Sequence, residues 1–145
     1  MKKTVRFFSI CMVAGVLVTL LSGSAIFKGW RAGEAEWIYV YIPETCSYNQ
    51  AFEAAVDVLS ESYEMGIVNK NERYVYTSWK FFRKSNGGED KNTRSRVTLK
   101  FSSDGRRIAV RTEVQMLHRH HWRDGYIEKF SRQTCDKIQM ALDNF

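Results

Sequence analysis

Three histidines, His118, His120 and His121, come closest to a reactive site by their type and spacing. In an extended strand His118 and His120 lie on the same side and could share a metal ion. However, no carboxylate or thiolate lies at a motif distance, and Arg119 and Arg123 add positive charge. The cluster is therefore typical of a solvated strand end or loop, and we expect neither a metal site nor a cofactor.

No catalytic motif stands out elsewhere in the chain. No serine lies in a G-x-S-x-G or S-x-x-K pattern. The Gly87-Gly88 pair lies in a charged stretch without the Lys-Ser or Lys-Thr that completes a phosphate-binding loop. No pair of carboxylates lies in an apolar setting. The sequence therefore indicates a protein without catalytic residues, and we expect no enzyme.

Hydrophobic periodicity predicts four strands and two helices. The strands are expected over residues 37–42, 73–82, 95–101 and 107–117 because their apolar residues alternate or are aromatic and β-branched. The helices are expected over residues 48–65 and 125–142, where apolar residues recur at three- and four-residue spacing. The fold class is therefore α+β, ordered β-α-β-β-β-α, with an antiparallel four-stranded sheet and two helices packed on one face.

Local signals mark where these elements begin and end. Ser47 and Gln50 match a capping box at the start of the first helix, and Gly66 is expected to end it. Asp104-Gly105 predicts a tight hairpin turn, and Asp124 is the candidate cap of the second helix. Residues 83–93 are charged and contain the glycine pair, so we expect a loop there.

Arginine and tyrosine side chains recur at alternate positions of the expected strands, where they would share the sheet face that the helices leave open. Both residue types are enriched at the energetic centres of protein interfaces. The alternative is that these side chains only keep the exposed sheet face soluble and bind no partner. The candidate partner-binding residues are Tyr74, Tyr76, Arg94, Arg96, Arg111 and Glu113.

The first 25 residues have the order of a bacterial secretory signal. Basic residues occupy positions 2, 3 and 6, an apolar run covers residues 7–21, and small residues end at Ala25. Basic residues stay on the cytoplasmic side while the apolar run enters the bilayer. We therefore expect the protein in the periplasm or cell envelope.

The end of this signal has three interpretations. Small residues at positions 23–25 suit cleavage after Ala25. Residues 21–23 also resemble the start of a lipoprotein box, but Ser24 stands where the lipidated cysteine would be, and a hydroxyl cannot carry the thioether-linked lipid. The third interpretation is an uncleaved inner-membrane anchor over residues 7–27, which approaches the roughly 20 residues that span a bilayer.

The remaining residues suit one domain, expected over 37–145 after a tether over 26–36. They keep 19 basic and 16 acidic residues, a net charge of +3. An exported protein with so small a charge is a poor candidate for a nucleic-acid partner.

Two cysteines remain after the signal, Cys46 and Cys135. An even count in an oxidising compartment predicts a disulfide between them. Closing so long a loop contributes about 4–5 kcal/mol in the chain-entropy model. The alternative is two independent buried thiols. Their spacing does not fit a metal site.

Four stretches carry a resemblance to a known group. They are A-F-E-A-A-V-D-V-L-S-E-S-Y-E-M-G, Y-V-Y-T-S-W, R-S-R-V-T-L-K-F and R-I-A-V-R-T-E-V-Q. Residues 37–142 resemble the helix-grip domains of bacterial envelope lipoproteins, a group that includes the C subunit of the outer-membrane β-barrel assembly machine. The resemblance implies a binding or assembly module.

We therefore expect an exported envelope accessory protein that binds another protein and catalyses no reaction. The alternative is a protein that binds a lipid or another small apolar ligand between sheet and helices. That alternative needs an internal cavity, which the bulky Phe52, Trp79, Phe101 and Phe130 would tend to fill.

Overall fold

The computed structural model describes residues 29–145. The predicted signal or anchor, with Ser24, lies outside the described residues. Within residues 29–145, no helix is long and apolar enough to cross a membrane.

Residues 29–145 form an α+β fold with two helices and one open antiparallel sheet of eight strands. The α+β class and the two helices agree with the sequence prediction, whereas the four-stranded sheet was wrong. The helices are α1 (Tyr48–Ser60) and α2 (Glu128–Leu142). The strands are β1 (Trp30–Ala32), β2 (Ile38–Tyr41), β3 (Met65–Asn69), β4 (Tyr74–Thr77), β5 (Lys80–Arg83), β6 (Glu89–Phe101), β7 (Arg107–His118) and β8 (His121–Ile127).

The long hairpin of β6 and β7 forms the centre of the sheet, from Thr93 opposite Met116 to Phe101 opposite Ile108. Each outer edge of this hairpin is shared by two shorter strands. On the β7 side, β2 pairs with residues 107–110 and β8 with residues 114–118. On the β6 side, β4 pairs with residues 98–100 and β5 with residues 89–95. β1 and β3 extend the sheet as its two outermost strands.

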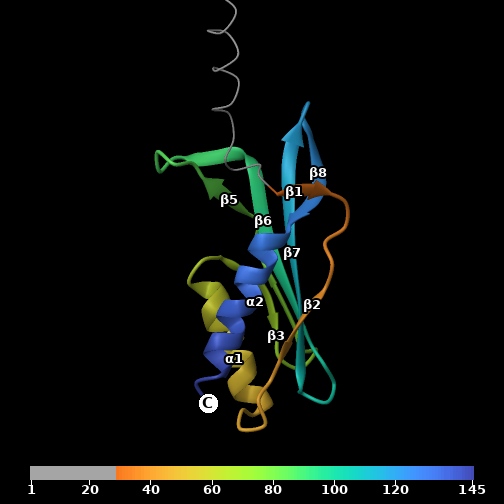
Figure 1. Cartoon of the computed structure of the whole chain (residues 1–145), viewed down its shortest axis with the longest axis vertical. Coiled ribbons are helices and arrows are strands. Elements are labelled where there is room, and N and C mark those ends of the chain that lie inside the picture. Colours follow the sequence, from red (N-terminus) through yellow and green to blue (C-terminus); the bar gives the residue numbers. More distant parts are fainter. Residues whose placement is uncertain (1–28) are drawn as a thin grey trace, which may run out of the picture.

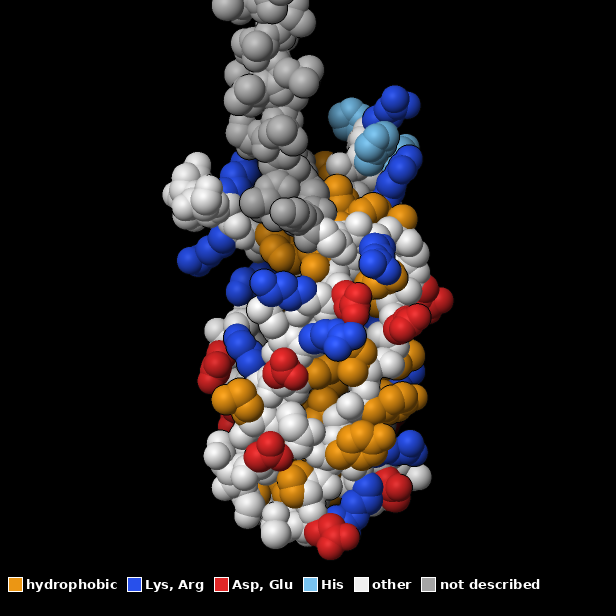
Figure 2. Space-filling model, viewed as in Figure 1, with side chains coloured by type: hydrophobic (Ala, Val, Ile, Leu, Met, Phe, Trp, Pro, Cys, Tyr) orange, Lys and Arg blue, Asp and Glu red, His pale blue; other side chains and the backbone are white. Residues whose placement is uncertain are grey.

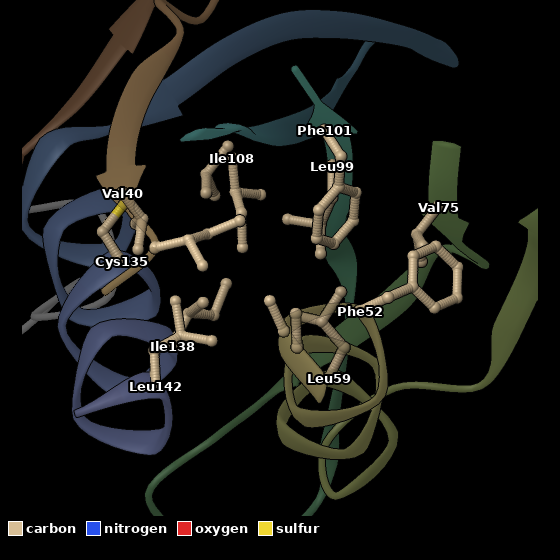
Figure 3. Packing of buried hydrophobic residues seen from close by; sticks show 14 of the residues in the cluster. Val40, Phe52, Leu59, Val75, Leu99, Phe101, Ile108, Cys135, Ile138 and Leu142 are labelled. Atoms are coloured by element: carbon tan, nitrogen blue, oxygen red, sulfur yellow. The ribbon is translucent and has the colours of Figure 1, made fainter. Parts of the chain in front are cut away.

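Both helices pack on the same face of the sheet, side by side near one end (Figure 1). The apolar stripes predicted for the helices face the strands, as Figure 3 shows for Phe52 and Leu59 of α1 and Ile138 of α2. They meet fully buried strand residues such as Leu99 and Ile108. Neither helix of residues 29–145 lies on the opposite face (Figure 1), so within these residues the helices cover the sheet on one side, as predicted.

Two predicted helix boundaries need correction. The capping box is present, with Ser47 accepting from the backbone of Gln50 and the Gln50 side chain accepting from the backbone of Ser47. However, α1 ends at Ser60 and Gly66 lies inside β3. Asp124 lies in β8 and caps nothing, because α2 starts three residues later than expected and its N-cap, Ile127, makes no side-chain hydrogen bond.

The additional strands form from segments whose sequence lacks a clear strand pattern. Residues 89–93, expected in a loop, extend β6, with Asp90 and Thr93 buried and the residues between them exposed. The expected strand over 73–82 breaks at residues 78–79 into β4 and β5. Three residues of the expected tether form β1, which pairs with β8.

Gly125 of β8 pairs with Ala32 of β1, and its substitution tests how closely β1 packs on this position. A Cβ there would collide with the carbonyl oxygen of Arg31 and the indole of Trp30. We expect Gly125→Ala to lower the free energy of unfolding by about 1–3 kcal/mol, because overpacking must displace backbone. Denaturant unfolding measures the change. Gly88→Ala is the control, because the nearest atom there belongs to the movable side chain of Asn86. Equal losses in both variants would contradict the close packing of β1 on Gly125.

Candidate functional site

The six predicted partner-binding residues lie together on the sheet face opposite the helices. The register places Arg96 opposite Glu113 and Arg111 opposite Thr98, with Tyr76 on the other side of Thr98. The residues between them, such as Val75 and Val97, are fully buried on the helix side. Alternation along the strands therefore brings Tyr74, Tyr76, Arg94, Arg96, Arg111 and Glu113 to one surface, which we call the arginine–aromatic face.

Two arginines of this face stack among aromatic rings. The Arg94 guanidinium carbon lies 3.9 Å from the ring centre of Trp122 and 4.7 Å from that of Trp79. The Arg96 carbon lies 4.5 Å from Trp79 and 5.4 Å from Tyr76. Such cation–π contacts hold the guanidinium groups in place while their edges still offer N–H donors.

Glu113 connects this stack to a second cluster. It accepts two hydrogen bonds from Arg96, at 2.7 and 3.2 Å, and lies 3.5 Å from Arg111. Arg111 also pairs with Glu34 at 2.9 Å and lies over the ring of Trp37, which Lys100 also faces. One half-buried carboxylate thus holds two arginines that come from neighbouring strands.

The two stacked arginines differ in their electrostatic surroundings. Hydrogen bonding to Glu113 raises the pKa of Arg96, whereas desolvation, followed by repulsion from Arg96, lowers the pKa of Arg94. Arg94 donates to the amide oxygen of Gln115 at 2.8 Å. Among residues 29–145, no carboxylate lies within 4 Å of its guanidinium. Of the three arginines of this face, Arg94 is therefore the one without a salt bridge among residues 29–145.

Sequence reasoning missed the aromatic residues that complete the face. Trp79 was expected on the buried side with Val75, but the break between β4 and β5 turns its ring toward Arg94 and Arg96. Tyr39 and Tyr41 of β2 are two further aromatic residues, and the alternation in the segment W-I-Y-V-Y-I could have indicated them. Val40 between them is buried, whereas Tyr39 and Tyr41 are 54% and 64% exposed. The face is therefore richer in aromatic side chains than the sequence indicated.

A pocket of about 280 Å³ lies on the other side of the sheet, between β5, β6 and the two helices. Its apolar lining consists of Val58, Leu59, Phe81, Phe82 and Phe130. Its polar lining consists of Ser62, Tyr63, Lys80, Arg83, Ser95, Thr134 and Lys137. Of the four side chains expected to fill such a cavity, Phe52 and Phe101 pack against each other in the core, with ring centres 5.1 Å apart. Phe130 lines the pocket, and Trp79 is not among its lining residues.

Tyr63 links the pocket to the pH dependence of stability. Burial raises its pKa from 10.0 to about 12, against the opposing hydrogen bond with Ser95. The folded state therefore holds this proton more tightly than the unfolded state. This contribution to stability is complete below pH 10 and is lost as the pH rises toward 12.

We therefore expect the unfolding free energy to fall more steeply between pH 10 and 11.5 in the wild type than in Tyr63→Phe. The excess slope is at most about 1 kcal/mol per pH unit. Urea unfolding at several pH values measures both slopes, and lysine titration affects both proteins alike. Parallel slopes would show that Tyr63 titrates in the folded protein as it does in the unfolded chain.

The three histidines lie at the tip of the β7–β8 hairpin and are exposed, as Figure 2 shows at the upper right. His118 and His121 pair across the strands, and the turn between them places Arg119 and His120 at positive φ. In the described part of the chain, no group of three histidine, cysteine or acidic residues could hold a metal ion.

Cys46 and Cys135 are both buried and free, so the structure lacks the predicted disulfide. Burial raises the pKa of both thiols, that of Cys135 to about 11. At neutral pH both are therefore protonated and poorly nucleophilic. The structure corresponds to the alternative of two buried thiols.

No protein-family model matches this sequence, and no curated protein matches it. The likeness to helix-grip domains therefore rests on the sequence pattern alone.

Proposed function

We propose that the protein is an exported accessory protein of the bacterial cell envelope that binds another protein and catalyses no reaction. The N-terminal 25 residues supply the export signal or, if uncleaved, the inner-membrane anchor. The helix-grip-like domain supplies the binding surface. The observation that carries the proposal is the arginine–aromatic face, which neither α1 nor α2 covers (Figure 1).

The composition of this face suits recognition of a protein. Tyrosine, tryptophan and arginine dominate interface hot spots because they combine large contact area with hydrogen-bonding groups. Arg94 and Arg96 are already stacked on Trp79. Their side chains therefore lose less conformational entropy on binding than free arginines would.

The polar and exposed parts of the face add selectivity. Tyr39 and Tyr41 are more than half exposed, and Arg107 lies over the Tyr39 ring. Two arginines of the face, Arg96 and Arg111, share the carboxylate of Glu113. The face therefore carries more cations than carboxylates. A partner with acidic side chains is therefore favoured over a basic one.

The test combines Tyr76→Ala with Arg111→Ala in the full chain. Each truncation at a true hot spot costs about 2 kcal/mol or more of binding free energy. We therefore expect the double variant to lose most of the partner that wild-type protein recovers after crosslinking in native membranes. Quantitative mass spectrometry measures the recovery, and circular dichroism verifies the fold.

The control variant combines Arg132→Ala with Met140→Ala. Both side chains are exposed on α2, on the opposite side of the molecule. It should recover the partner as the wild type does. Unchanged recovery by the Tyr76 and Arg111 variant would place the binding site elsewhere, with the surface of the two helices as the next candidate.

A second candidate function, binding of a small apolar ligand, is favoured by the pocket between sheet and helices. Such ligand sites are concave and mostly apolar, with a few polar groups that fix orientation. The 280 Å³ pocket has this composition, with Phe82 and Phe130 in edge contact at 5.9 Å. Because it lies across the sheet from the arginine–aromatic face, the two functions can coexist.

A further inference from the structure

We propose that the pocket between β5, β6 and the helices binds a short aliphatic carboxylate, with its chain inside and its carboxylate at the mouth. The proposal rests on the second candidate function and specifies its ligand. Three features of the pocket carry it: an apolar interior, polar interior groups that already have partners, and a mouth that is cationic only.

The interior provides an apolar surface from three elements. Val58 and Leu59 come from α1, Phe82 from β5 and Phe130 from α2. Removing an alkyl chain from water against such side chains is favourable by about 25 cal/mol for each Å² of apolar surface buried.

The polar groups inside the pocket are already hydrogen-bonded. Tyr63 Oη and Ser95 Oγ lie 2.9 Å apart, and Thr134 Oγ1 donates to the carbonyl oxygen of Phe130 at 3.0 Å. Tyr63 is a neutral phenol at neutral pH, and burial raises its pKa further, from 10.0 to about 12. These hydroxyls therefore keep their hydrogen bonds when an alkyl chain occupies the pocket. A charged group placed beside them would lose its hydration, which is unfavourable.

Three cations line the pocket at its exposed side. Lys80, Arg83 and Lys137 belong to the lining and are exposed, which places them at the mouth. Among residues 29–145, the lining contains no aspartate or glutamate. None of the three has a carboxylate within 4 Å among residues 29–145. An anionic group at the mouth would supply the missing counter-charge through charge-assisted hydrogen bonds.

Lys80 is the best-positioned of these cations. Its ammonium group donates to the carbonyl oxygen of Ser62 and lies 5.5 Å from the centre of the Tyr63 ring. These contacts fix the group at the pocket wall, and a lysine ammonium has three donors. Two N–H donors are therefore left for a ligand.

The volume limits the ligand to a small molecule. Ligand pockets for drug-sized molecules begin near 300 Å³, slightly above the 280 Å³ found here. A pocket of this size, lined on three sides by apolar side chains, suits a small ligand with a single alkyl chain of medium length. Octanoate is therefore the probe of choice.

The experiment compares three probes of equal chain length, octanoate, octan-1-ol and octylammonium, by calorimetric titration of the full chain. We expect octanoate to bind at least about tenfold more tightly than octan-1-ol, and octylammonium to bind more weakly than either. Chemical shifts should change most at Tyr63, Phe82 and Phe130. Shifts centred elsewhere would overturn the assignment of the site.

The charge requirement is tested with Lys80→Gln combined with Lys137→Gln. This variant should lose about tenfold in octanoate affinity and bind octan-1-ol as the wild type does. Lys91→Gln with Lys129→Gln removes two exposed lysines outside the pocket lining and is the matched control. If the wild type and both variants bind octanoate with equal affinity, the cations at the mouth do not bind the carboxylate, and the proposal is wrong.

The outcomes separate this inference from the proposed functions. If octan-1-ol binds as tightly as octanoate, the pocket takes apolar ligands and the proposed carboxylate is wrong. If no probe binds, the inference and the apolar-ligand function both fail. The protein-binding proposal is unaffected in either case, because its variants lie on the opposite face of the sheet.

Discussion

Glu113→Ala is expected to lower the free energy of unfolding by about 2–3 kcal/mol, because it leaves Arg96 and Arg111 without their shared carboxylate. The side chains of Arg96, Arg111 and Glu113 are only 28%, 21% and 18% exposed. Removing one partner of a well-buried ion pair costs about 3–5 kcal/mol, and the remaining solvent contact reduces that figure here. Urea unfolding at neutral pH measures the loss.

Two further variants separate charge from general truncation. Glu113→Gln keeps an oxygen acceptor for Arg96, so we expect it to lose about half as much as the alanine variant. Glu53→Ala breaks an exposed pair with Lys70, and such pairs contribute less than about 1 kcal/mol. If Glu113→Ala lost no more than Glu53→Ala, the network would be an ordinary surface ion pair and would not organise the face.

This network explains why the face can serve as a preformed binding surface. Glu113 fixes Arg96 from the neighbouring strand, and Arg96 in turn lies against Trp79 and Tyr76. The side chains that a partner would contact are therefore positioned before it arrives. The same contacts also contribute to stability, so binding and folding must be measured separately for every variant of the face.

The sequence predicted the parts of the fold that depend on local patterns. Alternation along β6 and β7 correctly separated Val97 and Val110 from Arg96 and Arg111. Ser47 and Gln50 marked the start of α1 because a capping box needs only four consecutive residues. The six predicted face residues were placed together for the same reason.

The missed strands depend on pairing partners that are distant in the sequence. Residues 89–93 are mostly charged, yet Glu89 and Asp90 pair with β5 and Thr93 pairs with Met116 of β7. Within this segment only Asp90 and Thr93 are buried. The β7–β8 turn has Arg119 and His120 at positive φ, where glycine or asparagine would normally give a turn signal. Without that signal, Asp124 and Gly125 were interpreted as the start of a helix.

The pocket could not be located from the sequence because it results from packing between elements. Phe81 and Phe82 were expected at the end of one long strand, whereas the break at residues 78–79 starts a second strand there, and both line the pocket. Lys80 and Lys137 are 57 positions apart in the chain. Only the fold shows that they belong to the same pocket.

Leu99→Ala is expected to lower the free energy of unfolding by about 3 kcal/mol. Leu99 is completely buried in β6, opposite Val75 of β4 and Val110 of β7, and it belongs to the cluster beneath both helices (Figure 3). Truncating such a leucine removes its transfer free energy and leaves a cavity, which together cost about 2–5 kcal/mol. Denaturant unfolding measures the change.

Leu99→Met is the matched control, because it keeps the side-chain volume and should cost less than about 1.5 kcal/mol. β6 carries Leu99 on its buried side and Arg94 and Arg96 on its other side. The arginine–aromatic face should therefore unfold together with the core. Tryptophan fluorescence reports on all four tryptophans, including Trp79 and Trp122, which contact Arg94. It should follow the same transition as circular dichroism in Leu99→Ala. Separate transitions would show that the face is stabilised by its own stacking, independently of the helix-covered core.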